Sequence, residues 1–227
     1  MPVSFDVRRF AEIDSTNTWV LAQARAGAPE GLVAVADHQT AGRGRLGRVW
    51  EAPAGANLLA TVLLRPAVVS YRSLACVALA GRDAAAAFGS SPGIKWPNDL
   101  VVEGPGRGKL AGVLAETDGA GAVAVGIGMN VGWAPPEAAR LDDGVSRDDV
   151  LDAWLAALGL WLDRSDREVA SAYRSACVTL GREVRVDLVD GSSFEGTAAD
   201  VDDDGRLLVE VDACLRTVDV ADVVHLR

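Results

Sequence analysis

The sequence lacks long hydrophobic runs. Hydrophobic residues make up 49% of the 227 residues, yet no run reaches about 18 apolar residues, the length that a membrane-spanning helix needs. The N-terminal sequence MPVSFDVRRF contains no basic segment followed by an apolar stretch, so it predicts no signal peptide. We therefore expect no membrane partner and no secretory leader.

Cysteine and histidine are also scarce. Three widely spaced cysteines, Cys76, Cys177 and Cys214, form no C-x-x-C pair, which indicates free thiols in a reducing cytoplasm. The two histidines, His38 and His225, lie far apart in the sequence. A His/Cys metal site is therefore not expected, and we assign no residue as a metal ligand.

Positive charge is in deficit. Lys and Arg total 22 against 32 Asp and Glu, which gives a net charge of −10. Proteins that bind nucleic acid usually carry a basic surface, because they neutralise phosphates. Strand-like sequence begins at Phe5, which leaves no room for a preceding DNA-binding module. We therefore expect no specific binding of DNA.

One stretch departs from this acidic balance. Residues 38–50 read HQTAGRGRLGRVW, in which Arg43, Arg45 and Arg48 are separated by glycines. Glycine lets the backbone approach a ligand closely, and each guanidinium supplies forked hydrogen-bond donors. The pattern favours an anion-binding loop over a merely solvated one.

The composition of this loop also suggests mobility. Leu46 and Val49 are its apolar anchors, and the glycines add conformational freedom. We expect residues 41–49 to be mobile until an anionic ligand orders the arginines.

The same loop matches the G-x-G-x-x-G pattern of dinucleotide-binding sites. That fingerprint requires a following helix and an acidic residue about 20 positions later. Proline and glycine follow within a few residues instead, and no Asp or Glu lies between residues 52 and 82. A Rossmann site is therefore rejected.

Apolar periodicity and turn residues predict the elements along the chain. Strands are expected over residues 5–10, 32–37, 56–64, 109–117 and 121–131, with a strand, turn and strand over 93–102. Helices are expected from residues 14–17 to about 25, and over 72–88, 147–163 and 166–178.

The sequence pattern changes near Gly181. From there on, apolar and polar residues alternate, and Asp-Gly pairs stand at 190–191 and 204–205 between apolar runs, which predicts hairpins. We expect a first domain over residues 1–180 and a small barrel of about five strands over residues 181–227.

Five motifs occur in order at compatible spacing. They are STN (15–17), QTAGRGRLGRVW (39–50), KWPNDL (95–100), KLAGVLAE (109–116) and GIGMNV (126–131). Together they resemble the signature of biotin protein ligases over nearly the whole chain. The closest likeness is to the short, monofunctional type, because no helix-turn-helix repressor domain precedes the first strand.

This resemblance implies a fold and a reaction. The expected fold is α+β: a mixed β-sheet with helices on one side, like that of class II synthetases, followed by an SH3-like β-barrel. The expected reaction joins the carboxylate of biotin to the α-phosphate of ATP, giving biotinyl-5′-adenylate and pyrophosphate. A lysine of a biotin carboxyl carrier domain of an acyl-CoA carboxylase then accepts the biotinyl group.

The resemblance also implies the conditions of that reaction. Biotin and ATP would be substrates, and Mg²⁺ would accompany ATP. The enzyme would be cytoplasmic, and a monomer or a weak homodimer.

The resemblance assigns roles to individual residues. Catalytic roles fall to Lys109, expected to bridge carboxylate and phosphate, and to Arg45, expected to retain the adenylate. The residues expected to bind biotin are Ser15, Thr16, Asn17, Gln39, Gly42, Arg43, Gly44, Arg45, Lys109, Gly112 and Gly126. Those expected to bind ATP or the adenylate are Arg45, Arg48, Trp50, Lys95, Asn98, Asp99, Lys109 and Asn130.

Two other functions remain as alternatives. A lipoate or octanoate ligase or transferase would share the fold and the acyl-adenylate chemistry, but its loop is less arginine-rich and it usually lacks the KWPND and KLAG combination. A metabolite-binding regulator on the same fold would not need Lys109 and would be expected to carry a DNA-binding element.

Overall fold

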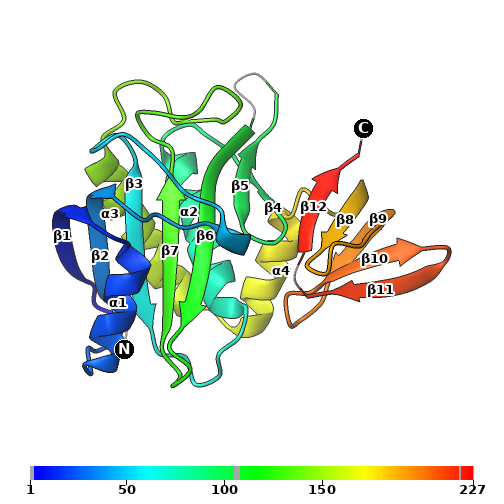
Figure 1. Ribbon diagram of the computed structural model, residues 1–227, viewed down its shortest axis with the longest axis horizontal. Helices are drawn as coiled ribbons and strands as arrows, with labels where there is room; N and C mark the ends of the chain where they lie inside the picture. Colours follow the sequence, from blue (N-terminus) through cyan, green and yellow to red (C-terminus); the bar gives the residue numbers. More distant parts are fainter. Residues whose placement is uncertain (1–2, 105–107, 220, 227) are drawn as a thin grey trace.

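The computed structural model describes residues 3–104, 108–219 and 221–226. A seven-stranded mixed sheet occupies the first part of the chain (Figure 1). Its strands in chain order are β1 (Asp6–Ile13), β2 (Leu32–Gln39), β3 (Leu58–Leu64), β4 (Gly93–Lys95), β5 (Asp99–Val102), β6 (Gly108–Thr117) and β7 (Val123–Met129). Their spatial order is β1-β2-β3-β7-β6-β5-β4, and only β1 and β2 pair in parallel among these described strands.

Three helices lie on one side of this sheet. They are α2 (Arg72–Ala87), α3 (Arg147–Leu162) and α4 (Asp166–Ala176), and they share one apolar core with the sheet (Figure 1). The alanines of α2 let that helix pack closely against β6 and β7, because a methyl group takes little room. This layer forms the main core of the molecule.

Helix α1 (Thr16–Arg25) lies on the opposite face. Val20 and Leu21 pack with Ala34 and Leu63 in a second, smaller core. Successive strand residues point to opposite faces, so β2 contributes Val33 to the main core and Ala34 to the smaller one. The α+β fold is therefore confirmed, but the expectation of helices on one side holds for three of the four α-helices that the described residues form.

The C-terminal part forms a second, wholly antiparallel sheet. Its strands are β8 (Glu183–Leu188), β9 (Ser193–Val201), β10 (Leu207–Val211), β11 (Cys214–Val218) and β12 (Ala221–His225), in the spatial order β11-β10-β9-β8-β12. The two Asp-Gly turns join β8 to β9 and β9 to β10, as predicted. The turn from β10 to β11 was missed, because Asp212 and Ala213 adopt positive φ without a glycine.

The two parts of the chain share one apolar core and also make specific polar contacts. The indole of Trp96 donates to the carbonyl of Gly205 at 2.9 Å, and the backbone N–H of Trp96 donates to Thr179 Oγ1 at 3.0 Å. Tyr71 lies against Gly205, and Arg174 forms an ion pair with Asp203 at 2.7 Å. The division of the chain at residue 180 stays a prediction.

Two smaller expectations concern thiols and membranes. All three cysteines are free, with Cys76 and Cys177 buried and Cys214 exposed, as expected. Within the described residues, no helix combines the length and the apolar character that crossing a membrane requires.

The two Asp-Gly turns provide a matched test of the contact between the sheets. Gly191 and Gly205 both have positive φ, but a Cβ would meet nothing at Gly191, whereas at Gly205 it would overlap the ring of Tyr71. Gly191→Ala should lower the free energy of unfolding by about 1 kcal/mol, the cost of the backbone conformation alone. Gly205→Ala should lower it by about 3 kcal/mol, because overpacking adds to that cost. Urea unfolding of both variants measures the difference, and equal losses would show that the Tyr71 contact carries no stability.

Candidate functional site

A cavity of about 370 Å³ opens between the two sheets. Its walls come from the start of α1, the arginine loop, the turn between β4 and β5, strands β6 and β7, and the C-terminal strands β8 and β12. The structure brings most of the predicted site residues together here. Those lining the cavity are Ser15, Thr16, Asn17, Gln39, Arg43, Gly44, Arg45, Arg48, Trp50, Lys95, Asn98, Asp99, Lys109, Gly112 and Gly126.

One end of the cavity carries polar groups without charge. Thr16 donates to Gln39 Oε1 from both its backbone N–H, at 2.8 Å, and its hydroxyl, at 2.9 Å. Behind them, the fully buried Thr61 of β3 places its hydroxyl oxygen 2.7 Å from Thr16 Oγ1 and 2.7 Å from Asn17 Oδ1. A chain of four oxygen atoms therefore runs along this end.

The three contacts between these four oxygen atoms have only two hydroxyl hydrogens between them. The three close oxygen–oxygen contacts share the hydroxyl hydrogens of Thr16 and Thr61, and each hydroxyl carries one. Asn17 cannot supply another, because its Nδ2 donates to Glu116 at 2.8 Å and to the carbonyl of Leu114 at 3.2 Å. The polar end is therefore short of donors, and it fits a ligand that brings N–H groups.

Glycine at position 126 makes this arrangement fit. A Cβ there would overlap Asn17 Oδ1 and come within 3.1 Å of Thr61 Oγ1. Ser15 stands at the N-cap of α1, but its side chain makes no capping bond to the described residues, so its hydroxyl is available to a ligand. The start of α1 thus serves the cavity.

Bare backbone also underlies the middle of the cavity. Gly112 of β6 faces Gly128 of β7 across the strand pair, and the indole of Trp50 lies on them. A Cβ on Gly128 would come within 2.6 Å of that ring. The Nζ of Lys109 lies 5.3 Å from the centre of the Trp50 ring and 2.8 Å from Asp99.

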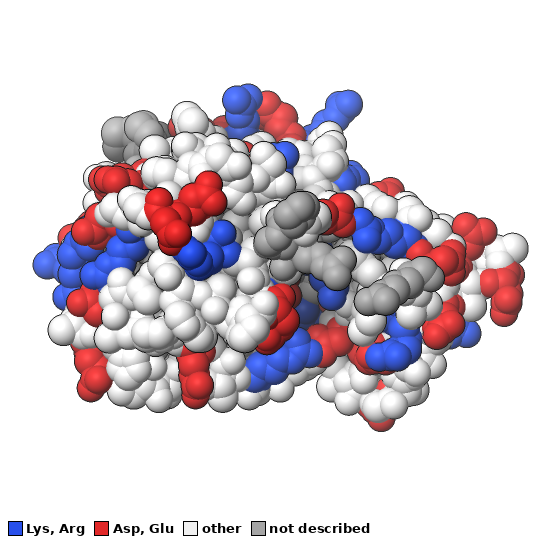
Figure 2. All heavy atoms as spheres, turned by 90° about the horizontal axis from the view of Figure 1, so that it is seen from above, with Lys and Arg blue, Asp and Glu red and all other residues white. Residues whose placement is uncertain are grey.

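The other end of the cavity is cationic, because Arg45, Arg48, Lys95 and Lys109 gather there around Asp99. With Arg43, which pairs with Glu116 beside the polar end, five basic side chains line the cavity together with three carboxylates, an excess of two positive charges in a chain of net charge −10. Lys95 and Lys109 are the only two lysines of the sequence. On the face shown in Figure 2, by contrast, basic and acidic side chains are interspersed.

Burial and mutual repulsion act on these cations. Burial lowers the pKa of Lys95; Asp99 raises it, and the nearby charges of Lys109 and Arg48 lower it further. Burial likewise lowers the pKa of Arg45, with Asp99 acting in the opposite direction and Arg48 adding to the decrease. An anion entering this end would therefore relieve the repulsion between neighbouring cations.

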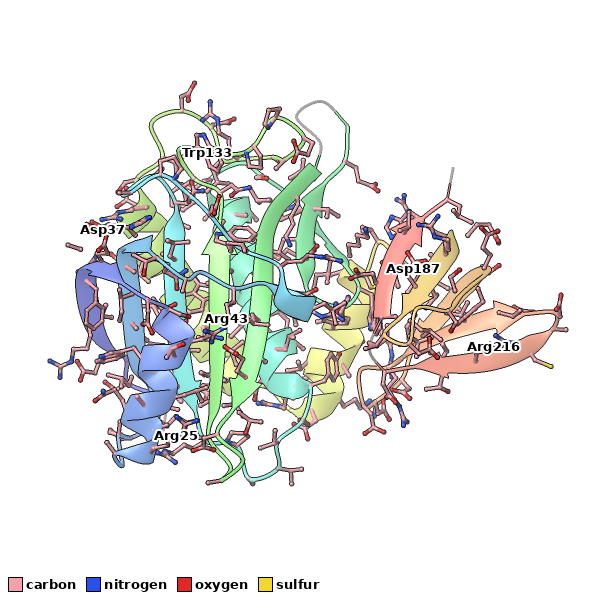
Figure 3. The ribbon with its side chains drawn as sticks, in the orientation of Figure 1. Arg25, Asp37, Arg43, Trp133, Asp187 and Arg216 are labelled. Carbon is pink, nitrogen blue, oxygen red and sulfur yellow. The ribbon has the colours of Figure 1, made fainter. Side chains whose placement is uncertain are left out.

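The arginine loop has more partners than its sequence suggested. Arg43, which lies over the sheet in Figure 3, pairs with Glu116 at 3.0 Å. Arg45 donates to Asn98 Oδ1 at 3.3 Å and to the carbonyl of Ala221 at 3.1 Å. Arg48 forms an ion pair with Asp222 of β12. Polar contacts rather than apolar anchors thus hold the loop, and its mobility stays a prediction.

The comparisons with known proteins agree with this geometry. Residues 10–133 match the Biotin/lipoate A/B protein ligase family, and residues 179–226 match the biotin protein ligase C terminal domain. The chain belongs to the biotin/lipoate A/B protein ligase family. It is therefore a ligase.

Two relatives and one solved structure illustrate the relationship. The biotin--[acetyl-CoA-carboxylase] ligase of Mycobacterium tuberculosis is 38% identical over 238 residues, which cover 96% of this chain and 88% of the relative. The ligase of the same name from Paracoccus denitrificans is 32% identical over 240 residues, covering 94% and 98%. The biotin protein ligase from Aquifex aeolicus in complex with biotin and ATP has a TM-score of 0.81 at 24% identity, covering 97% of this chain and 99% of that one, and it supports the fold.

Two predicted site residues of this ligase do not line the cavity. Gly42 lies beside a second groove, and a Cβ there would overlap the carbonyl oxygen of Trp50, so glycine is needed for close backbone approach. Asn130 is buried, and its amide donates to the carbonyls of Lys109, at 3.1 Å, and Ala139, at 2.9 Å. The structure thus places Asn130 beneath the Lys109 backbone, and its expected contact with adenosine stays a prediction.

The structure also adds residues that the sequence motifs did not single out. They are Thr61, Glu116, Gly128, Asp187 and Asp222. Thr61 is the one polar residue in the strand sequence LLATVLL, and Glu116 ends the KLAGVLAE motif, so both carried a signal. Asp187, labelled in Figure 3, and Asp222 are two among many acidic residues of the C-terminal sheet, where nothing in the sequence distinguishes them.

Proposed function

We propose that this ligase joins biotin to a protein in two steps. ATP first activates biotin to biotinyl-5′-adenylate with release of pyrophosphate. The biotinyl group then passes to a lysine of a biotin carboxyl carrier domain of an acyl-CoA carboxylase, the class of acceptor that the names of the relatives imply.

The donor-poor polar end of the cavity carries this proposal. The ureido ring of biotin presents two N–H donors and one carbonyl acceptor. The oxygen atoms of Thr16, Asn17 and Gln39 can accept those N–H groups, since they share too few hydrogens among themselves. The hydroxyl of Ser15 can donate to the carbonyl. Lipoate and octanoate bring no N–H groups and would leave these oxygens without partners.

The cationic end suits the first step. An oxygen of the biotin carboxylate attacks the α-phosphorus of ATP, and the bond from that phosphorus to the bridging oxygen breaks as pyrophosphate leaves. Lys109 would neutralise both the carboxylate and the phosphate as they meet. Arg45, Arg48 and Lys95 would stabilise the charge that spreads over the phosphate oxygens.

The second step forms an amide. The amine of the carrier lysine attacks the acyl carbon of the adenylate, AMP leaves with the electrons of the carbon–oxygen bond, and the amine loses a proton. Arg45 would hold the adenylate until the carrier arrives, because its guanidinium can bridge the oxygens of the mixed anhydride with paired hydrogen bonds.

Magnesium would enter with the nucleotide. Among the described residues, no three His, Cys, Asp or Glu side chains gather closely enough to hold a metal ion. The phosphates of ATP would therefore supply most of the ligands, with Asp99 as a carboxylate that lines the cavity beside Lys109. When bound, Mg²⁺ neutralises phosphate charge.

A panel of acids tests the proposed function. Exchange of labelled pyrophosphate into ATP should depend on biotin and should proceed about four orders of magnitude less efficiently with lipoate or octanoate, because a site built for N–H donors rejects ligands that lack them. Comparable exchange with lipoate or octanoate would contradict the proposal. Labelling of a purified carrier domain, followed with streptavidin, measures the second step.

Lys109 is expected to be essential for the first step. Lys109→Ala should lower biotin-dependent pyrophosphate exchange by at least about two to three orders of magnitude, on the scale of lost electrostatic stabilisation. Lys109→Arg keeps the charge and should retain part of the activity. Circular dichroism checks that both variants fold, and near-normal exchange by a folded Lys109→Ala would remove this residue from the mechanism.

Arg45 is expected to keep the adenylate rather than to make it. Each charge-assisted hydrogen bond is worth roughly 1.5–3 kcal/mol. Losing two of them in Arg45→Gly should speed release of the adenylate by about two to four orders of magnitude, while Lys109 still supports its formation. Bystander proteins with exposed lysines should then become biotinylated.

A streptavidin blot of a protein mixture and the rate of adenylate loss measure this effect. Arg140→Gly is a suitable control, because Arg140 pairs with Asp143 and does not line the cavity. Labelling that stays confined to one carrier, with release unchanged, would show that Arg45 does not hold the intermediate.

A further inference from the structure

Glu116 is a charged residue beside the cavity that the proposed chemistry leaves without a role. It stands near the end of β6, and its side chain is 31% exposed. Its carboxylate accepts a hydrogen bond from Asn17 Nδ2 at 2.8 Å. It also accepts two from the guanidinium of Arg43, at 3.0 and 3.1 Å. One carboxylate thus joins the polar end of the cavity to the arginine loop.

The bond to Asn17 determines how its amide lies. Both Nδ2 hydrogens are used, one by Glu116 and one by the carbonyl of Leu114, and neither partner can donate in return. The amide oxygen must therefore face Thr61 and the cavity. Without Glu116, one N–H would lose its partner and the amide could turn, which would replace an acceptor at the polar end with a donor.

The bond to Arg43 fixes one end of the loop. The same guanidinium donates to Thr18 Oγ1 of α1 at 3.0 Å, so Arg43 holds the loop against α1 and β6. Arg45 and Arg48 hold the other end against β12. Among these arginine contacts, the pair with Glu116 is the one that connects directly to a residue of the polar end.

We propose that Glu116 is a positioning residue that couples binding at the polar end to closure of the loop, an inference that rests on the proposed function. A ureido N–H of biotin that donates to Asn17 Oδ1 would hold the amide in one orientation. The amide then holds the carboxylate where Arg43 can reach it. Through this carboxylate, the loop responds to the binding of an uncharged group at Asn17.

Two variants separate the two bonds. Glu116→Gln keeps an oxygen that can accept from Asn17 but loses the charge that attracts Arg43. Glu116→Ala loses both. Glu103→Gln is the matched control, because it also breaks a Glu–Arg pair, with Arg182, and Glu103 does not line the cavity.

The readouts need no catalytic turnover. Trypsin cleaves after arginine, so its rate of cleavage at Arg43, Arg45 and Arg48, followed by mass spectrometry, reports opening of the loop. The rates are measured with and without biotin as the sole ligand, and the Kd for biotin is measured by calorimetry.

The expected pattern differs between the variants. Glu116→Gln should raise the rate of cleavage without biotin about three- to fivefold, the scale of a partly exposed ion pair, and should weaken biotin binding less than Glu116→Ala does. Glu116→Ala should weaken biotin about tenfold, and biotin should no longer protect the loop. Glu103→Gln should match the wild type in both readouts.

Other outcomes would overturn the proposal. Unchanged cleavage in both Glu116 variants would show that Arg43 does not depend on this carboxylate. Weaker binding of biotin with protection intact would make Glu116 a support for Asn17 alone. A wild-type protein that binds no biotin would refute the proposed function itself and, with it, the coupling to this ligand, whereas the cleavage rates without biotin would still report on the Arg43 contact.

Discussion

The site depends on the absence of side chains in the middle of two central strands. Gly126 leaves room for the amide of Asn17, while Gly112 and Gly128 leave room for the indole of Trp50. Glycine inside a strand costs about 0.5–1 kcal/mol relative to alanine, because it loses more conformational freedom on folding. The large alanine-rich core behind β6 and β7 can bear this loss. The sheet therefore combines a well-packed face with an opposite face that is hollowed at its centre.

This hollow separates two kinds of chemistry. At one end, hydroxyl and amide oxygens from α1, β2 and β3 meet without net charge. At the other, lysines and arginines gather around Asp99. A ligand that is neutral and hydrogen-bonding at one end and anionic at the other can therefore be oriented by the cavity. The C-terminal sheet reduces the positive charge of the second end, because Asp222 forms an ion pair with Arg48.

Local sequence predicts much of the fold, because its signals are local. The alternation of apolar residues and the Asp-Gly turns predicted the strand content of the C-terminal part and two of its turns. The turn at Asp212 and Ala213 escaped, since alanine gives no sign that it will adopt positive φ. The face on which α1 packs also escaped, because it depends on which side of β2 and β3 has room for Val20 and Leu21.

The candidate site shows the same limit. Motifs identified residues such as Lys109 and Gln39 that line the cavity. They did not identify Thr61 or Glu116, whose importance comes from strands that meet only in the folded chain. Asn130 belongs to a motif, yet the turn that follows β7 directs its amide toward backbone carbonyls. Position in a motif thus predicts proximity to the site better than it predicts which side chains line the cavity.

The placement of the two lysines has a consequence for the surface of the enzyme. Lys95 and Lys109 are the only lysines of the sequence, and both line the cavity. The other Lys and Arg positions are therefore all arginines. Guanidinium groups stay protonated and are poor nucleophiles, whereas free amines attack acyl phosphates. The ammonium of Lys109 is held by Asp99 at 2.8 Å. Under the proposed chemistry, the α-amino group aside, the exterior offers an escaping acyl-adenylate no amine to acylate, so the enzyme is a poor substrate for its own intermediate.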